Sequence, residues 1–96
     1  MLNENVLRRI RQAVREKRYR LSDHALEEAD ADDLTLDDIL GVLLQGDLVA
    51  TYTEDPRGVR YVVSDAVRNE DVEVVCRLRA DDSLLVIITV YVVTER

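Results

Sequence analysis

Apolar residues in the first half of the chain recur at steps of three and four positions, which is the spacing of an amphipathic helix. This pattern predicts a helix over residues 3–18, with an inner face made of Val6, Ile10, Ala13 and Val14. A second helix is expected to begin at Ser22 or Asp23, because either side chain can cap a first turn. Its inner face is expected to comprise Ala25, Leu26 and Ala29.

A third helix is predicted between Thr35 and Gly46. The Thr35 hydroxyl can cap its first turn, and Asp38 stands three residues further on, as in a capping box. Gly46 is expected to end the helix. The apolar stripe between these two signals consists of Leu36, Ile39, Leu40, Leu43 and Leu44.

After Gly46 the apolar period changes to two, which is typical of β-strands. Strands are expected at residues 48–53, 59–64, 72–78 and 84–93, with turns at 54–58 and 80–83 and a polar loop at 65–71. Because the connections are short, neighbouring strands are expected to be antiparallel. The 96 residues therefore predict a single α+β domain, with N-terminal helices followed by a four-stranded antiparallel sheet. The predicted core includes Leu40, Leu43, Val74, Cys76 and Ile88.

Charge is distributed unevenly along the chain, and the net charge is −7. This net negative charge argues against electrostatic attraction between nucleic acid and the protein as a whole, but it does not exclude a local basic site. Residues 8–20 contain seven basic side chains and one acidic one, whereas residues 23–38 contain eight acidic side chains and no Lys or Arg. The two segments fit solvated helix faces of opposite sign, and the basic one also fits a patch for RNA or an acidic partner.

With a single cysteine, Cys76, the chain cannot form an internal disulfide or a cysteine-based zinc site. A single histidine among many carboxylates does not resemble a clustered metal site, so no metal or other cofactor is expected. We expect no signal peptide, and the apolar segment 84–93 is too short to cross a bilayer as a helix. The expected protein is therefore cytoplasmic, without a membrane partner.

The only histidine, His24, is the clearest candidate for proton transfer, because an imidazole titrates near neutral pH. It stands at the start of the second predicted helix, where a capping or packing role is the alternative interpretation. On the strands, Arg60 and Arg77 are candidate phosphate ligands, since the guanidinium group matches phosphate geometry. Surface solubility is the alternative role for both arginines.

The chain also resembles a known bacterial family of small domains of unknown function. The resemblance rests on an ordered set of segments, from Ser-Asp-His-Ala (22–25) through Glu-Asp-Pro-Arg-Gly (54–58) and Val-Val-Cys (74–76) to Ile-Thr-Val-Tyr (88–91). The family's S-x-H-A start matches at His24, and its I-T-V-Y end matches at Thr89 and Tyr91. The family is similar in fold to the RelE, BrnT and colicin-type ribonuclease toxins. This likeness implies RNA cleavage without a metal ion.

One departure from the family changes the expected chemistry. Many relatives carry a histidine just before Val-Val-Cys, where this chain has Glu73. Cleavage by two histidines is therefore excluded, but Glu73 and His24 can divide the roles of base and acid. Glu73, Arg77, Thr89 and Tyr91 form one polar patch if the strands pair so that these faces coincide. The candidate catalytic residues are thus His24, Glu73, Arg77, Thr89 and Tyr91, with Arg60 as a candidate phosphate ligand.

Three functions remain open on the sequence alone. The first is a ribonuclease toxin that acts on RNA and is controlled by an antitoxin or another protein. The second is a non-catalytic protein-binding module derived from a toxin-like fold, which the acidic run and Glu73 favour. The third is an oligomer-forming domain, which is favoured if the apolar segment 84–93 lies at a sheet edge.

Overall fold

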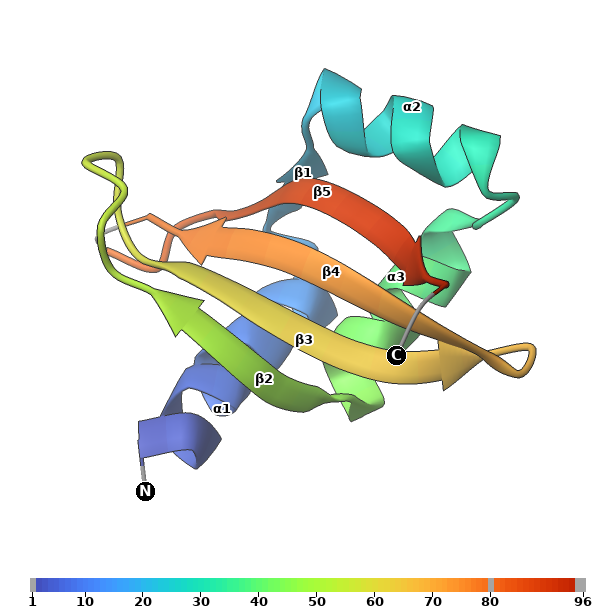
Figure 1. Ribbon diagram of the computed structural model, residues 1–96. Helices are drawn as coiled ribbons and strands as arrows, with labels where there is room; N and C mark the ends of the chain where they lie inside the picture. Colours follow the sequence, from blue (N-terminus) through green and yellow to red (C-terminus); the bar gives the residue numbers. More distant parts are fainter. Residues whose placement is uncertain (1, 80, 95–96) are drawn as a thin grey trace.

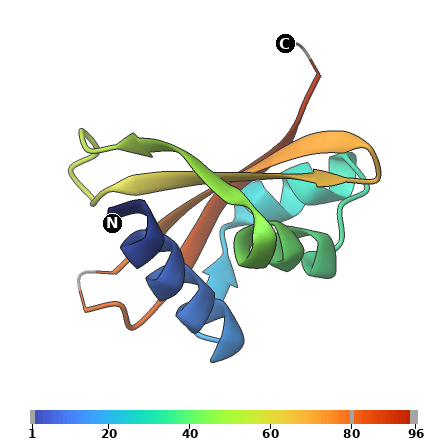
Figure 2. The same ribbon diagram turned by 90° about the horizontal axis from the view of Figure 1, so that it is seen from below.

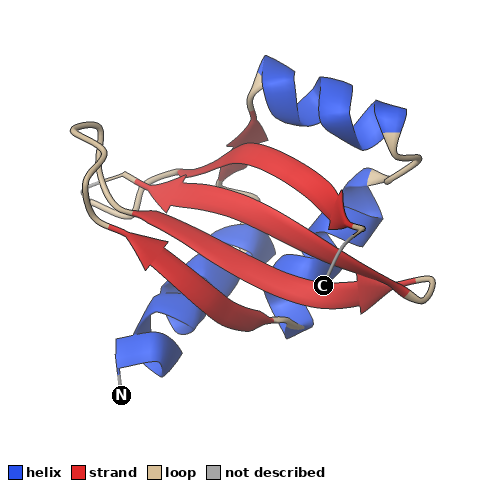
Figure 3. Ribbon diagram, viewed as in Figure 1, coloured by secondary structure: helices blue, strands red, loops and turns tan. Residues whose placement is uncertain are grey.

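The computed structural model describes residues 2–79 and 81–94, and within them it contains three helices and five strands (Figures 1 and 3). The helices lie mainly in the first half of the chain and the long strands in the second, as predicted. In chain order the elements are α1 (Leu2–Arg15), β1 (Tyr19–Leu21), α2 (Asp23–Ala31), α3 (Leu36–Gln45), β2 (Asp47–Tyr52), β3 (Arg60–Val67), β4 (Glu70–Leu78) and β5 (Leu85–Val93).

The strands form one mixed sheet in the order β1-β5-β4-β3-β2. Strands β2 to β5 pair with antiparallel neighbours, whereas β1 pairs with β5 in parallel, with Tyr19 opposite Leu85. The predicted four-stranded antiparallel sheet is therefore wrong, because β1 was missed. Three residues are too few to show an alternating pattern, and β1 lies next to β5 only through the fold. The likeness to RelE-type toxins stays a prediction.

Helices α1 and α3 cover one face of the sheet, and α2 packs along β5 beside β1 (Figures 1 and 2). No helix among the described residues lies across the opposite face (Figure 2). We call this opposite side the open face. From β4 and β5 it carries Glu73, Val75, Arg77, Val86, Thr89 and Tyr91, as the strand register places these residues.

The core lies between the sheet and the helices, and it confirms three of the five residues predicted there. Leu43, Val74 and Cys76 are fully buried, and burial raises the pKa of the Cys76 thiol to about 12. Leu40 is half-buried at the margin of the core. Leu26 and Leu36, predicted on inner helix faces, are exposed, whereas Ala25 and Ala29 are buried as expected.

The prediction that Ile88 is buried in the core is wrong, because the ladder between β4 and β5 is irregular at this point. Val75 pairs with Thr89, but Cys76 pairs with Ile87, so Ile88 is the extra residue of a bulge. Ile87 is fully buried, and Ile88 is half-buried. The bulge also keeps Thr89 and Tyr91 on the same face as Glu73.

Residues 65–71, predicted as a polar loop, instead continue β3 and β4 into a tight hairpin. Only Arg68 and Asn69 form the turn, and both have positive φ angles, +48° and +70°. Positive φ angles at both positions are typical of a two-residue hairpin loop, and asparagine adopts them more readily than most residues. The polar residues misled the prediction because the ends of these strands are largely exposed.

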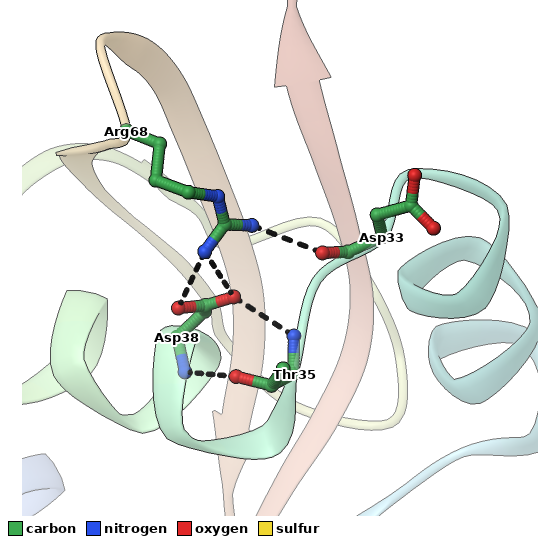
Figure 4. A network of polar contacts seen from close by, with 4 residues as sticks. All are labelled: Asp33, Thr35, Asp38 and Arg68. Carbon is green, nitrogen blue, oxygen red and sulfur yellow. Dashed lines mark hydrogen bonds and ion pairs between the residues drawn. The ribbon is translucent and has the colours of Figure 1, made fainter.

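The turn residue Arg68 is tied to the start of α3 (Figure 4). Thr35 and Asp38 form the predicted capping box, with the Thr35 N–H donating to the Asp38 carboxylate at 2.9 Å and the Asp38 N–H donating to the Thr35 hydroxyl at 3.0 Å. The Arg68 guanidinium donates to the same carboxylate at 3.1 Å and to the Asp33 carbonyl at 3.0 Å. The network therefore fastens the β3–β4 hairpin to a helix end.

This network makes the stability of the fold depend on pH in the acidic range. The Thr35 backbone N–H, followed by the Arg68 guanidinium, holds the pKa of Asp38 below its usual range. A lowered folded-state pKa contributes stability above the ordinary carboxyl pKa of about 3.9, and this contribution is lost as the pH falls through the folded-state pKa. We therefore expect Asp38→Asn to flatten the fall in denaturation midpoint below about pH 5.

The control is Asp37→Asn, which changes the same charge at an exposed position in the same helical turn. Denaturant titrations of the three proteins between neutral pH and about pH 3 would measure the effect. An Asp38→Asn protein that follows the wild-type pH dependence would show that the network does not stabilise the fold.

Candidate functional site

The strand register gathers three of the predicted site residues on the open face. Glu73 pairs with Tyr91, and Val75 pairs with Thr89, so Glu73, Thr89 and Tyr91 are neighbours on that face. Cross-strand partners of this kind have Cβ atoms roughly 5 Å apart. Arg77, which pairs with Val86, lies further along the same face.

His24 reaches this group through Glu28, which the sequence analysis did not single out. The Thr89 hydroxyl donates to Glu28 Oε1, and His24 Nε2 lies 3.2 Å from the same oxygen. The His24 side chain is 65% exposed, so it is accessible to a large substrate. One carboxylate oxygen therefore links the histidine of α2 to the threonine of β5.

Ser22 fixes the helix that carries His24 against the sheet. Its hydroxyl accepts a hydrogen bond from the Ala25 N–H at 3.0 Å, which caps α2, and donates to the Ile88 carbonyl at 2.7 Å. The Ser22 N–H donates to the Ile87 carbonyl at 2.9 Å. The start of α2 is thus held on β5 at the bulge, one residue before Thr89.

Tyr91 completes the group with a strong hydrogen bond. Its hydroxyl donates to Glu73 Oε1 at 2.6 Å. This bond, together with burial, raises the pKa of Tyr91 to about 12, and the negative charge of Glu28 acts in the same direction. Tyr91 therefore stays protonated near neutral pH. We call His24, Glu28, Glu73, Thr89 and Tyr91 the open-face cluster.

The two predicted arginines lie away from this cluster. Arg77 is four residues from Glu73 along β4, which is roughly 13 Å at the rise of a strand. Its side chain passes Gly58 in the β2–β3 loop, so closely that a Cβ on Gly58 would stand 3.3 Å from Arg77 Cδ. Arg60 lies 3.6 Å from Asp55, and its guanidinium lies 5.9 Å from the centre of the Tyr52 ring.

Arg77 belongs instead to a cavity of about 450 Å³ that four arginines line, and we call it the arginine cavity. It is formed where α1, the β2–β3 loop and the end of β4 meet, with Tyr61 as its aromatic residue. Its volume falls within the range of roughly 300–1,000 Å³ that is common for ligand sites. The arginines are Arg9, Arg57, Arg77 and Arg79.

Two of the four arginines already have carboxylate partners. Arg9 donates to both oxygens of Asp82 at 2.8 Å, which raises the pKa of Arg9 and lowers that of Asp82. Arg57 lies 3.2 Å from Asp55. Among the described residues, neither Arg77 nor Arg79 forms a side-chain hydrogen bond or an ion pair. Asp81 is the nearby carboxylate of Arg79: hydrogen bonds from Ser83 and, to a smaller degree, the charge of Arg79 lower its pKa. The cavity therefore holds two guanidinium groups without a hydrogen-bonded or ion-paired partner in the described part of the chain.

Sequence reasoning missed Glu28 and three of the cavity arginines for different reasons. Glu28 stands four residues after His24 in a predicted helix, and this spacing places the two side chains side by side. The sequence spacing was therefore sufficient to predict contact between Glu28 and His24. Arg9, Arg57 and Arg79 come from three separate elements, and no local pattern predicts that they meet.

Two further observations concern only the described residues. No group of three or more His, Cys, Asp or Glu side chains among them is arranged to hold a metal ion. No described helix combines the length and the apolar character needed to cross a membrane.

Comparison with known proteins identifies the family of the chain. No curated protein and no solved structure shows significant similarity. A family model described as a domain of unknown function (DUF4258) matches residues 21–92, which is three quarters of the 96 residues. The match includes the whole open-face cluster and leaves α1 with Arg9 outside. The predicted membership of a family of unknown function is thus confirmed: the chain belongs to the DUF4258 family.

Proposed function

We propose that this domain cleaves RNA without a metal ion, and that the open-face cluster performs the proton transfers. The observation that carries the proposal is the shared Glu28 oxygen, which joins the accessible His24 to Thr89 on the face that also presents Tyr91 and Glu73. The resemblance to ribonuclease toxins supports the same reaction class.

The reaction is an attack by the ribose 2′-hydroxyl on the adjacent phosphorus. A new P–O2′ bond forms and the P–O5′ bond breaks, which gives a 2′,3′-cyclic phosphate and a free 5′-hydroxyl. One group must accept the 2′-hydroxyl proton and another must protonate the leaving 5′-oxygen. In our proposal Glu73 is the base and protonated His24 is the acid, and Glu28 holds the imidazole in position.

The remaining requirement is stabilisation of charge on the phosphate oxygens in the transition state. The Tyr91 hydroxyl, which donates to Glu73 in the free protein, can turn its proton to a phosphate oxygen of the bound strand. Arg77 lies on the same face but roughly 13 Å along β4, so it suits a neighbouring phosphate of the strand better than the one that is cut. Arg60 is engaged with Asp55 and Tyr52, and its Nε atom is buried without a hydrogen-bond partner among the described residues. Its proposed contact with phosphate therefore requires a rearrangement of this side chain.

The test is incubation of purified protein with a single-stranded RNA in the presence of a metal chelator. We expect products that end in a 2′,3′-cyclic phosphate, because the attacking group is the 2′-hydroxyl. A substrate with 2′-deoxyribose throughout is the control and should stay intact. Absence of cleavage above that of a His24→Ala protein purified in the same way would overturn the proposal.

A second candidate is a non-catalytic protein-binding module. The observation that favours it is β2, an edge strand that exposes Val49 and Tyr52, each 52% accessible. An edge strand offers free backbone groups that can pair with an extended segment of a partner. A protein that pairs there, such as an antitoxin, would be compatible with either function. Chelator-resistant cleavage separates the two, because a binding module shows none.

The third function, an oligomer-forming domain, was conditional on a sheet edge at residues 84–93. Strand β5 lies between β1 and β4, so this condition is not met. The apolar character of the strand is explained by its position inside the sheet, where Leu85, Val86, Ile87 and Val90 are all buried.

A further inference from the structure

We propose that the arginine cavity binds phosphate groups of an RNA strand, away from the bond that is cut. The identification of the ligand as RNA rests on the proposed function. The binding of phosphate rests on the cavity itself, where Arg77 and Arg79 have no ion-pair or side-chain hydrogen-bond partner among the described residues. This local excess of positive charge is found on a chain whose net charge is −7.

The chemistry of the cavity selects an anion with several acceptor oxygens. Each guanidinium presents a planar set of N–H donors that matches the oxygens of a phosphate. Arg9 is paired with Asp82 and Arg57 with Asp55, so these two guanidinium groups already have carboxylate partners. Arg77 and Arg79 supply the donors that remain available to a ligand.

Gly58 helps to keep the Arg77 side chain in this place. Its φ angle is +129°, a backbone conformation that other residues rarely adopt, and the stem of Arg77 lies against it. The β2–β3 loop therefore supports the arginine from one side, while Tyr61 lines the cavity from β3.

A second, smaller cavity extends the basic surface. It has a volume of about 170 Å³ and shares Arg9 with the first cavity, and Asp82, the carboxylate partner of Arg9, also lines it. Arg8 and Arg18 also line it, and both come from the basic segment 8–20 of the sequence. Because Arg9 lines both cavities, arginines are present at two adjoining sites, which suits successive phosphates of a strand better than one isolated phosphate group.

The experiment is a fluorescence anisotropy titration with a labelled single-stranded 2′-O-methyl oligoribonucleotide. This strand cannot be cut by 2′-hydroxyl attack, so its affinity is measured apart from catalysis. We expect Arg77→Gln and Arg79→Gln each to weaken binding by about tenfold, the usual loss for a charge-assisted hydrogen bond. Each should also reduce the slope of log K against log salt by roughly 0.7.

The matched control is Arg15→Gln, which removes the same charge from an exposed position of α1 outside both cavities. It should bind nearly as wild type, and circular dichroism should show that all variants are folded. The inference is overturned if the cavity variants bind as tightly as Arg15→Gln. Binding of inorganic phosphate with no binding of the oligonucleotide would overturn the assignment to RNA.

This inference and the proposed catalysis fail in different ways. Wild-type protein that binds the strand through Arg77 and Arg79, but does not cut the 2′-hydroxyl form, contradicts catalysis and supports the cavity. Cleavage that persists while affinity is independent of both arginines contradicts the cavity alone.

Discussion

Replacement of Ile87 by alanine is expected to lower the free energy of unfolding by about 2–5 kcal/mol, the usual cost of emptying a core site. Ile87 has no exposed surface and belongs to the cluster that joins the sheet to the helices. Alanine removes three carbons from a strand with neighbours on both sides, so the structure can relax only partly into the space. A denaturant titration of both proteins would measure the difference.

The adjacent residue provides a matched control. Ile88→Ala deletes the same atoms at the half-buried bulge position, and we expect a loss of less than about 1 kcal/mol. The Ser22 hydroxyl bonds to the Ile88 carbonyl, which alanine retains. Equal losses for the two variants, or a larger loss for Ile88→Ala, would show that the bulge does not place Ile87 inside and Ile88 outside.

This pair of residues shows where sequence patterns lose their information. Over residues 84–93 nearly every residue is apolar, so no alternation tells which side chains face the helices. The register is set instead by β4, where Val72, Val74, Cys76 and Leu78 alternate clearly and are all buried. The bulge opposite Cys76 then changes which residues of β5 face the helices, and no residue type in the sequence predicts this bulge.

Elements with strong local signals were predicted correctly. The capping box at Thr35 and Asp38, the start of α2 at Ser22 and the end of α3 at Gly46 all appear in the structure. These features depend on hydrogen bonds between residues close in sequence. Strand β1 depends on a partner more than sixty residues away, so its formation is a property of the whole fold.

In the candidate site, too, local features could be predicted from the sequence and contacts between distant elements could not. The sequence placed Thr89 and Tyr91 on one face of their strand and Glu73 and Arg77 on one face of theirs, but only the register of the structure makes the two faces coincide. The path from His24 to Thr89 through Glu28 requires the packing of α2 on β5, which sequence does not specify. The arginine cavity requires three elements to meet, and it could not be read from any single segment.

Replacement of His24 by alanine is expected to reduce RNA cleavage by about 10²–10⁴-fold, the usual contribution of a general acid or base. The imidazole is the only one in the chain, and it is accessible on the face that carries the other cluster residues. Because its side chain is 65% exposed, the substitution should change stability by no more than about 0.5 kcal/mol. Initial cleavage rates and a denaturant titration would separate the two effects.

Glu28→Gln tests whether the carboxylate positions this histidine. The amide can still accept the Thr89 hydrogen bond, but it removes the negative charge beside His24 Nε2. We expect an intermediate loss of rate with an unchanged denaturation midpoint, whereas a purely structural role would lower both. Glu27→Gln, a neighbouring exposed position on α2, is the control and should behave as wild type. Cleavage by His24→Ala at the wild-type rate would contradict the acid–base role of this histidine.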